Sequence, residues 1–266
     1  MRAKRTARKA LERWLLASAV CGVLLFVLFP RATATEHENR FRQFLFGVDY
    51  YPEQWDEALW ETDAQRMQDA GVNAVRIAEF GWSVMEPGEG KYDFSLFDRA
   101  IDVLGRHGVK VILGTPTATP PKWLTHEYPE VLHVFADGQK ANDQTRRHYC
   151  YNSTLYRKFS RQVVEAMASH YQDNPNVIGW QIDNEFNNEN PECFSESCRG
   201  AFRVWLKSKY SSLDALNARW GTRFWSQFYT AWEQIDLPAP ATSLHNPALM
   251  LDFKRFISDS VSSYMA

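Results

Sequence analysis

The sequence predicts an α/β fold in which short parallel strands alternate with amphipathic helices. Apolar runs at 44–50, 73–78, 109–114 and 177–182 indicate strands, and patterns with helical spacing lie between them. The composition of the 266-residue chain, 45% hydrophobic and 23% charged, is that of a globular protein with a large core. This βα alternation is typical of a barrel or of a doubly wound sheet.

The first βα unit runs from strand 44–50 through a loop rich in aromatic residues to a helix. Asp56 is positioned to cap this helix and Gly71 to end it, because glycine tolerates the left-handed conformation that follows many helices. The apolar side chains between them recur at helical spacing, at Leu59, Trp60, Ala64, Met67 and Ala70.

Further units follow the first. Strand 73–78 leads to a helix at 95–107, and strand 109–114 leads to a helix from about 156 to 171. Strand 177–182 is predicted to be a buried core strand, because apolar and β-branched residues fill it. Helices are also predicted at 202–210, 213–220 and 246–264, and no fifth strand is evident before Ala266.

The tripeptide Asp183-Asn184-Glu185 directly follows the last predicted strand. Parallel α/β barrels place their active sites at the carboxyl ends of the strands, so an acid at this point is well placed for chemistry. Taken alone, such a tripeptide is more often a solvated turn.

Charge and composition narrow the range of functions. A net charge of −2 at pH 7 argues against a protein that coats nucleic acid. Ten Trp, eleven Tyr and seventeen Phe suit a carbohydrate site, because sugar C–H faces stack on flat rings, although aromatic residues fill ordinary cores as readily. The sequence contains no nucleotide, flavin or haem motif.

Residues 1–34 differ from the rest of the chain. A basic stretch at 1–13 precedes an apolar stretch at 14–29, and Ala32-Thr33-Ala34 matches the pattern of signal peptide cleavage. The apolar stretch is shorter than the roughly 20 residues that cross a bilayer, so cleavage is favoured over a permanent signal anchor. We therefore expect a secreted protein, a membrane-tethered one if the segment is retained, or a cytoplasmic one if translation starts downstream.

A resemblance to one enzyme family covers about residues 44–256. It rests on five motifs in the family's order: GVDYYPEQW at 47–55, RIAEF at 76–80, TPPKWL at 119–124, RHYC at 147–150 and QIDNE at 181–185. With these motifs the chain resembles family 42 of the glycoside hydrolases, which are mainly β-galactosidases. A non-carbohydrate α/β protein would have to match all five by coincidence.

The resemblance implies a (β/α)₈ TIM barrel, of which residues 41–266 supply about the first half, and a retaining mechanism with two carboxylates. Glu185 matches the family's acid/base, which protonates the departing glycosidic oxygen and then activates water. Burial or a neighbouring negative charge keeps such an acid protonated near neutral pH.

Three more residues match the family's sugar site. Asn184 and Arg146 match residues that bind the sugar beside the scissile bond, and Trp225 resembles an aromatic residue of that site. Simpler interpretations exist, with Arg146 as an ordinary loop cation and Trp225 as a packed core ring. The substrate implied is a terminal β-galactoside or a galactose-containing oligosaccharide, and catalysis needs no cofactor.

Three cysteines match a zinc site found in many family members. In these members one Cys follows the His-Tyr pair, as Cys150 does, and three more form a Cys-x-Cys-x-x-Cys run. Cys193 and Cys198 match the ends of that run, and Ser195 stands at its middle position. Because a serine hydroxyl is a poor zinc ligand, three outcomes stay open. They are zinc with water or Glu196 as the fourth ligand, a disulfide between two thiols, and free thiols.

The family's nucleophilic Glu follows the seventh strand, and we expect none of that kind in this chain. Glu53, Glu79, Glu86 and Glu189 are interpreted as loop acids or hydrogen-bonding groups. Since retention needs two carboxyl groups about 5 to 5.5 Å apart, the chain is predicted to be a truncated fragment that is inactive alone. The complete protein is expected to be a homotrimer, as family members often are.

Two other functions share many of these features. A secreted carbohydrate-binding module or degenerate pseudo-enzyme would keep Trp55, Trp123, Arg146 and Asn184 as a sugar surface without turnover. A related barrel enzyme that acts on β-glucosides or β-mannosides would share the Asn-Glu pair. Sugar binding without hydrolysis distinguishes the first, and a panel of nitrophenyl glycosides distinguishes the second.

Overall fold

The computed structural model describes residues 44–186 and 192–266. The predicted signal segment at 1–34 and the acid Glu189 lie outside the described residues. The chain divides into two units, Met1–Phe44 and Leu45–Ala266, and the second contains the sheet and helices. None of the described helices is long and apolar enough to cross a membrane.

Four parallel strands form one sheet. They are β1 (Gly47–Asp49), β2 (Ala74–Ile77), β3 (Lys110–Gly114) and β4 (Val177–Gln181). Their order in the sheet is β1-β2-β3-β4, the order of the chain. Consecutive strands of a barrel follow this order, whereas a doubly wound sheet reverses direction at a switch point. The structure therefore confirms the α/β prediction and favours the barrel over the doubly wound alternative.

Three long helices follow the first three strands. They are α2 (Glu57–Asp69), α4 (Ser95–Arg106) and α6 (Thr154–Tyr171). As predicted, the Asp56 side chain caps α2 by accepting a hydrogen bond from the Ala58 amide at 3.0 Å. Gly71 after α2 and Gly108 after α4 have φ of 78° and 73°, a left-handed conformation that glycine adopts without steric penalty.

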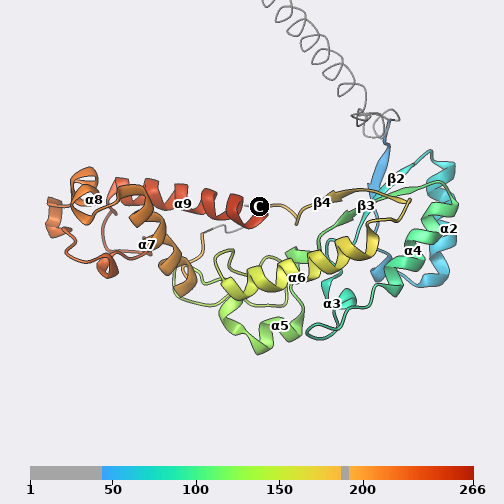
Figure 1. Cartoon of the computed structure of the whole chain (residues 1–266), viewed down its shortest axis with the longest axis horizontal. Helices are drawn as coiled ribbons and strands as arrows, with labels where there is room; N and C mark the ends of the chain where they lie inside the picture. The colour runs from blue at the N-terminus through green and yellow to red at the C-terminus, as the bar shows by residue number, and fades with distance from the viewer. Residues whose placement is uncertain (1–43, 187–191) are drawn as a thin grey trace, which may run out of the picture. The chain divides into compact units, whose positions relative to one another are not determined.

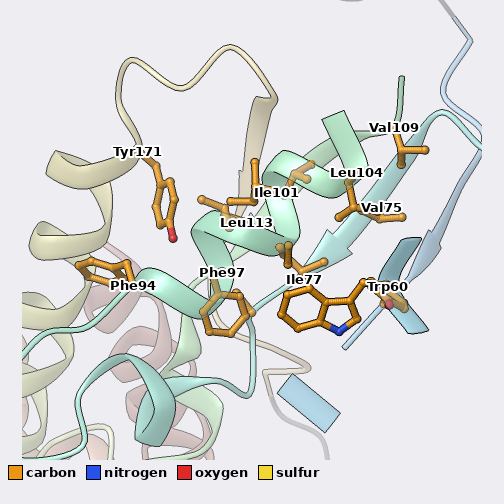
Figure 2. Packing of buried hydrophobic residues seen from close by; sticks show 14 of the residues in the cluster. Trp60, Val75, Ile77, Phe94, Phe97, Ile101, Leu104, Val109, Leu113 and Tyr171 are labelled. Carbon is orange, nitrogen blue, oxygen red and sulfur yellow. The ribbon is translucent and has the colours of Figure 1, made fainter. Parts of the chain in front are cut away.

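These helices lie beside the sheet (Figure 1) and bury one apolar cluster against it. Trp60 of α2 and Phe97 of α4 meet Ile77 of β2 and Leu113 of β3, and Figure 2 shows these side chains gathered beside the strands. All four are nearly inaccessible to solvent. Because each buried apolar side chain of this size contributes about 1.5–3 kcal/mol, the cluster fixes the strands and hence the positions of their carboxyl ends.

Strand β4 differs from the prediction of a buried core strand. Among the described strands it pairs only with β3, and Trp180 and Ile182 are 40% and 54% exposed. An edge strand lacks a neighbour on one side, so its apolar side chains are only partly covered. An apolar, β-branched sequence indicates a strand but does not reveal how many neighbours that strand has.

The predicted C-terminal helices are present as α7 (Glu196–Tyr210), α8 (Leu213–Trp220) and α9 (Pro247–Met265). They bury a second apolar cluster that includes Phe202, Trp220 and Phe253. Two short helices were not predicted, because they are too short to show a periodic pattern. These are α3 (Trp82–Met85) and α5 (Lys122–Glu127). Single 3₁₀ turns lie at Pro52–Gln54, Pro116–Ala118, Pro129–Val131, Phe224–Ser226 and Trp232–Gln234.

Candidate active site

The tripeptide Asp183-Asn184-Glu185 follows the carboxyl end of β4, as the sequence predicts. Asp183 and Glu185 have φ of 54° and 49°. Residues other than glycine rarely adopt this left-handed conformation, which costs of the order of 1 kcal/mol or more. Surrounding contacts therefore have to hold this turn.

Asp183 is the anchor of the turn. It is fully buried, and its carboxylate accepts hydrogen bonds from Thr117 Oγ1 at 2.7 Å, Tyr149 OH at 3.1 Å and Tyr264 OH at 3.3 Å. It also accepts a hydrogen bond from the backbone amide of Asn184 at 2.6 Å. Burial, and then the Asp183 charge, raises the pKa of both tyrosines, so both stay protonated donors.

Arg147 completes this support from the loop before α6. Its side chain is only 5% exposed, and its Nη1 lies 4.0 Å from Asp183 Oδ1. The same guanidinium donates to the backbone carbonyl of Asn184 and to the hydroxyl of Tyr151. One buried cation therefore holds both the anchor and the residue that precedes the proposed acid/base.

Glu185 and Arg146 lie together on a more open side of the turn. Glu185 Oε2 is 2.7 Å from Arg146 Nη2, and the two side chains are 48% and 35% exposed. Arg146 also lines a hollow of about 330 Å³ with His148 and Tyr151. The structure therefore brings a carboxylate and a cation together beside space that a ligand can enter.

Asn184 is oriented by a chain of hydrogen bonds from the sheet. Arg76 Nη1 donates to Gln181 Oε1 at 2.7 Å, so the amide nitrogen of Gln181 faces the turn and donates to Asn184 Oδ1 at 3.3 Å. Arg76 is itself paired with Asp49 at 2.8 Å. With its oxygen engaged in this way, Asn184 has its amide nitrogen as the donor to offer a substrate hydroxyl.

The other described acids have structural surroundings. Glu86 accepts a hydrogen bond from Trp82 Nε1 at 2.7 Å, and Glu79 accepts one from Tyr51 OH at 2.9 Å. Glu53 differs, because neither of its carboxylate oxygens has a hydrogen-bond partner among the described residues. Burial, and then the neighbouring Glu79, raises the pKa of Glu53 to about 7.

Trp225 lines a different hollow from Arg146. It lies in the turn after α8 with φ of 51°, and its ring stacks on Phe224 at a centroid distance of 4.6 Å. Its hollow, of about 380 Å³, is also lined by Trp220 and Leu244. At 63% exposed it is not a packed core ring, so the simpler interpretation of this residue is wrong.

Cys150, Cys193 and Cys198 form a buried cluster. Their sulfur atoms all lie within 4.8 Å of one another, and the three are free thiols, with Cys150 and Cys198 3.4 Å apart. A zinc ion with tetrahedral Zn–S bonds of about 2.3 Å spaces its sulfurs by roughly 3.8 Å. The distances and the donor type therefore fit a zinc ion.

The electrostatics of the cluster favour a cation. Hydrogen bonds from Cys150 and then Cys198, with a further contribution from His133, hold the pKa of Cys193 well below its usual value. Its thiolate in turn raises the pKa of Cys150 to about 12. Hydrogen bonds within the cluster thus stabilise a thiolate, and thiolates are the form that binds metals.

Sequence reasoning missed the residues that support the turn. Asp183, Arg147 and Gln181 lie inside the quoted motifs, so their positions were marked although their roles were not. Tyr264 was missed entirely, because it belongs to α9 and reaches Asp183 only through the tertiary fold.

A family model described as Beta-galactosidase matches residues 49–266. The chain belongs to family 42 of the glycoside hydrolases. This family 42 chain is 46% identical to β-galactosidase Bga of Halorubrum lacusprofundi over 219 residues, which are 82% of this chain and 31% of the relative. The β-galactosidase of Thermus thermophilus is 43% identical over 83% of this chain and 34% of its own length.

Solved structures show the same fold. The β-galactosidase structure from Halorubrum lacusprofundi matches with a TM-score of 0.80 at 45% identity, over 83% of this chain and 33% of that one. The enzyme from the psychrophilic Marinomonas ef1 matches with a TM-score of 0.80 at 41% identity, over 83% and 34%. This family 42 chain thus spans about one third of the length of the relatives it matches, and the prediction of a partial barrel of this family is confirmed.

Proposed function

We propose that this chain supplies the acid/base half of a retaining β-galactosidase active site. The observation that carries the proposal is the position of Glu185 after β4, with its carboxylate 2.7 Å from Arg146 and with Asn184 beside it. The names of the relatives, which are β-galactosidases, support a terminal β-galactoside as the substrate.

In this proposal Glu185 first donates a proton to the departing glycosidic oxygen and then, as a carboxylate, takes a proton from the attacking water. Asn184 offers its amide nitrogen to a sugar hydroxyl next to the reacting carbon. A hydrogen bond at that position strengthens as positive charge develops in the transition state, so it accelerates the reaction as well as binding the sugar. Arg146 orients the Glu185 carboxylate and supplies donors to the same subsite.

We assign the nucleophilic carboxylate to a later strand of the complete barrel. Retention requires it about 5 to 5.5 Å from Glu185. Glu79 and Glu86 are engaged in hydrogen bonds to Tyr51 and Trp82, which supports their structural interpretation. The chain by itself is therefore expected to lack hydrolytic activity.

The test uses a protein in which this chain is joined to the remaining strands of the barrel. Glu185→Gln keeps the shape of the side chain and removes the acid, so kcat on β-galactosides with poor leaving groups should fall by about 10²–10⁴. Glu127→Gln, at an exposed position, is the matched control. Hydrolysis by Glu185→Gln at the parental rate contradicts the assignment, and turnover of β-glucosides in preference to β-galactosides contradicts the substrate.

The alternative of a sugar-binding surface without turnover has less support. Trp123, one of its expected residues, donates its Nε1–H to the Glu86 carbonyl at 2.8 Å and packs edge-on against Phe159. A ring held in this way has a structural role. Trp55 is 56% exposed and remains available to a sugar.

We also propose that Cys150, Cys193 and Cys198 hold a structural zinc ion. Their mutual distances, burial and shared thiolate support this assignment. Such an ion links the start of α7 to the loop before α6, so its binding free energy contributes to folding. Titration of the reduced chain with zinc should saturate at one ion per chain and protect the three thiols from alkylation.

Two further proposals concern export and assembly. We propose that residues 1–34 direct export, which N-terminal sequencing of the mature protein tests. A mature protein that begins at Met1 contradicts cleavage. Light scattering of the complete enzyme tests the expected homotrimer.

A further inference from the structure

We propose that His133 is the fourth ligand of this zinc site and that Ser195 is not a ligand. The inference rests on the zinc ion proposed above. Three thiols leave a tetrahedral ion one ligand short. Asn152 already donates its Nδ2–H to Cys198 Sγ at 3.3 Å. Ser195 and His133 also lie next to the cluster and compete for the fourth position, and the structure gives them different surroundings.

The backbone around His133 is tied to both segments that carry cysteines. The Cys150 amide donates to the Val131 carbonyl at 2.8 Å, and the Phe194 amide donates to the Val134 carbonyl at 2.8 Å. His133 therefore lies between two residues that are each hydrogen-bonded to a cysteine or to its immediate neighbour. This arrangement fixes the backbone of His133 beside the cluster without any metal.

The imidazole of His133 is buried with an unused nitrogen. The residue is 5% exposed, and its Nε2 has no hydrogen-bond partner among the described residues. Leaving a polar atom buried and unpaired costs about 1–3 kcal/mol, which coordination to an ion would offset. The ring already interacts with the Cys193 sulfur, and neutral imidazole is a good zinc ligand. Because it approaches from the Cys193 side, ligation requires the ring to turn toward the ion.

Ser195 is the N-cap residue of α7. Its Oγ lies 3.2 Å from Cys150 Sγ, but it already accepts a hydrogen bond from the Cys198 amide at 3.2 Å. Such a cap stabilises a helix by about 1 kcal/mol, and a neutral hydroxyl is a poor ligand for zinc. Coordination to zinc would therefore lower the free energy less for Ser195, whose hydroxyl already caps a helix, than for His133, whose Nε2 has no partner among the described residues.

The test titrates the whole reduced chain with Co²⁺, whose visible absorption depends on the number of thiolate ligands, and with Zn²⁺ in competition with a chelator. Since loss of an outer partner of a ligand already weakens metal binding 10- to 100-fold, His133→Asn should lower zinc affinity by about 100-fold or more and change the Co²⁺ spectrum. Ser195→Ala should leave both readouts unchanged.

Ser195→Cys separates ligation from misfolding. It supplies a fourth thiolate, so the Co²⁺ bands should move to lower energy, and His133→Asn in that background should no longer weaken binding. The inference is overturned if His133→Asn binds zinc as the parent does, or if Ser195→Ala reproduces the loss. Failure of the parental chain to bind any metal would refute the zinc proposal itself, and the role of His133 with it.

Discussion

Arg146 and Glu185 form an ion pair, with Nη2 2.7 Å from Oε2, on the open side of the turn after β4. The next residue, Arg147, turns instead to the buried Asp183. The two adjacent arginines thus have different partners, since Arg146 pairs with the proposed acid/base and Arg147 holds the buried anchor of the turn. Substitutions at the two positions should separate activity from stability.

Arg146→Gln should impair activity and leave the fold intact. In the complete enzyme we expect kcat/KM for β-galactosides to fall about 10- to 100-fold, because a hydrogen bond to a charged group contributes about 1.5–3 kcal/mol. The free energy of unfolding should change by less than about 1 kcal/mol, since both partners are partly exposed. Steady-state kinetics and urea unfolding measure the two effects. Arg66→Gln, which removes an exposed arginine paired with Asp63, is the control.

Arg147→Gln should have the opposite profile. It leaves Asp183 buried without its cation, so the free energy of unfolding should fall by about 3 kcal/mol, near the lower end for a broken buried pair because Thr117 and Tyr149 still donate. Urea unfolding of this chain measures the loss. Adding Asp183→Asn should recover part of it. If Arg147→Gln is as stable as the parent, the buried pair does not hold the turn.

The regular elements of the fold could be predicted from the sequence because local signals define them. Asp56 and Gly71 bracket α2 as expected, and the apolar run at 177–182 gives β4. The partial exposure of β4 could not be predicted, because exposure depends on which strands lie beside it. The turn that positions Glu185 is likewise held by contacts distant in sequence, such as that of Tyr264.

The candidate site was predicted in part, through motifs more than through physical pattern. Glu185, Asn184 and Arg146 were named and lie together, whereas Trp225 lines a separate hollow. The involvement of His133 could not be predicted, since a lone histidine in a loop carries no spacing signal. Its significance arises only when the fold brings it to the cysteines.

Gln181 is predicted to be a positioning residue for Asn184. Gln181→Leu removes the donor that holds Asn184 Oδ1, so the Asn184 amide can rotate and present its oxygen to the sugar. We expect kcat/KM to fall about tenfold, the equivalent of one hydrogen bond. Asn184→Ala should lower kcat/KM by more than Gln181→Leu does, and the double variant should have the same kcat/KM as Asn184→Ala alone. Independent, additive losses would show that Gln181 does not act through Asn184.

Glu53 should make the stability of the chain depend on pH. Its pKa of about 7 in the folded chain lies above the ordinary value of 4.5. As the pH rises from about 4.5 to 7, the unfolded chain releases this proton while the folded chain retains it, so this contribution to stability is lost across that window. Allowing for its partial exposure, the loss is roughly 2 kcal/mol.

Glu53→Gln removes the titration and keeps the shape of the side chain. Relative to the parent, this variant should gain roughly 2 kcal/mol of unfolding free energy at about pH 8 compared with about pH 4, measured by urea unfolding at both pH values. Glu130→Gln, at an exposed position, controls for the loss of one negative charge. A difference between Glu53→Gln and the parent that is the same at both pH values would mean that Glu53 has the same pKa in the folded and the unfolded chain, so that burial does not raise it.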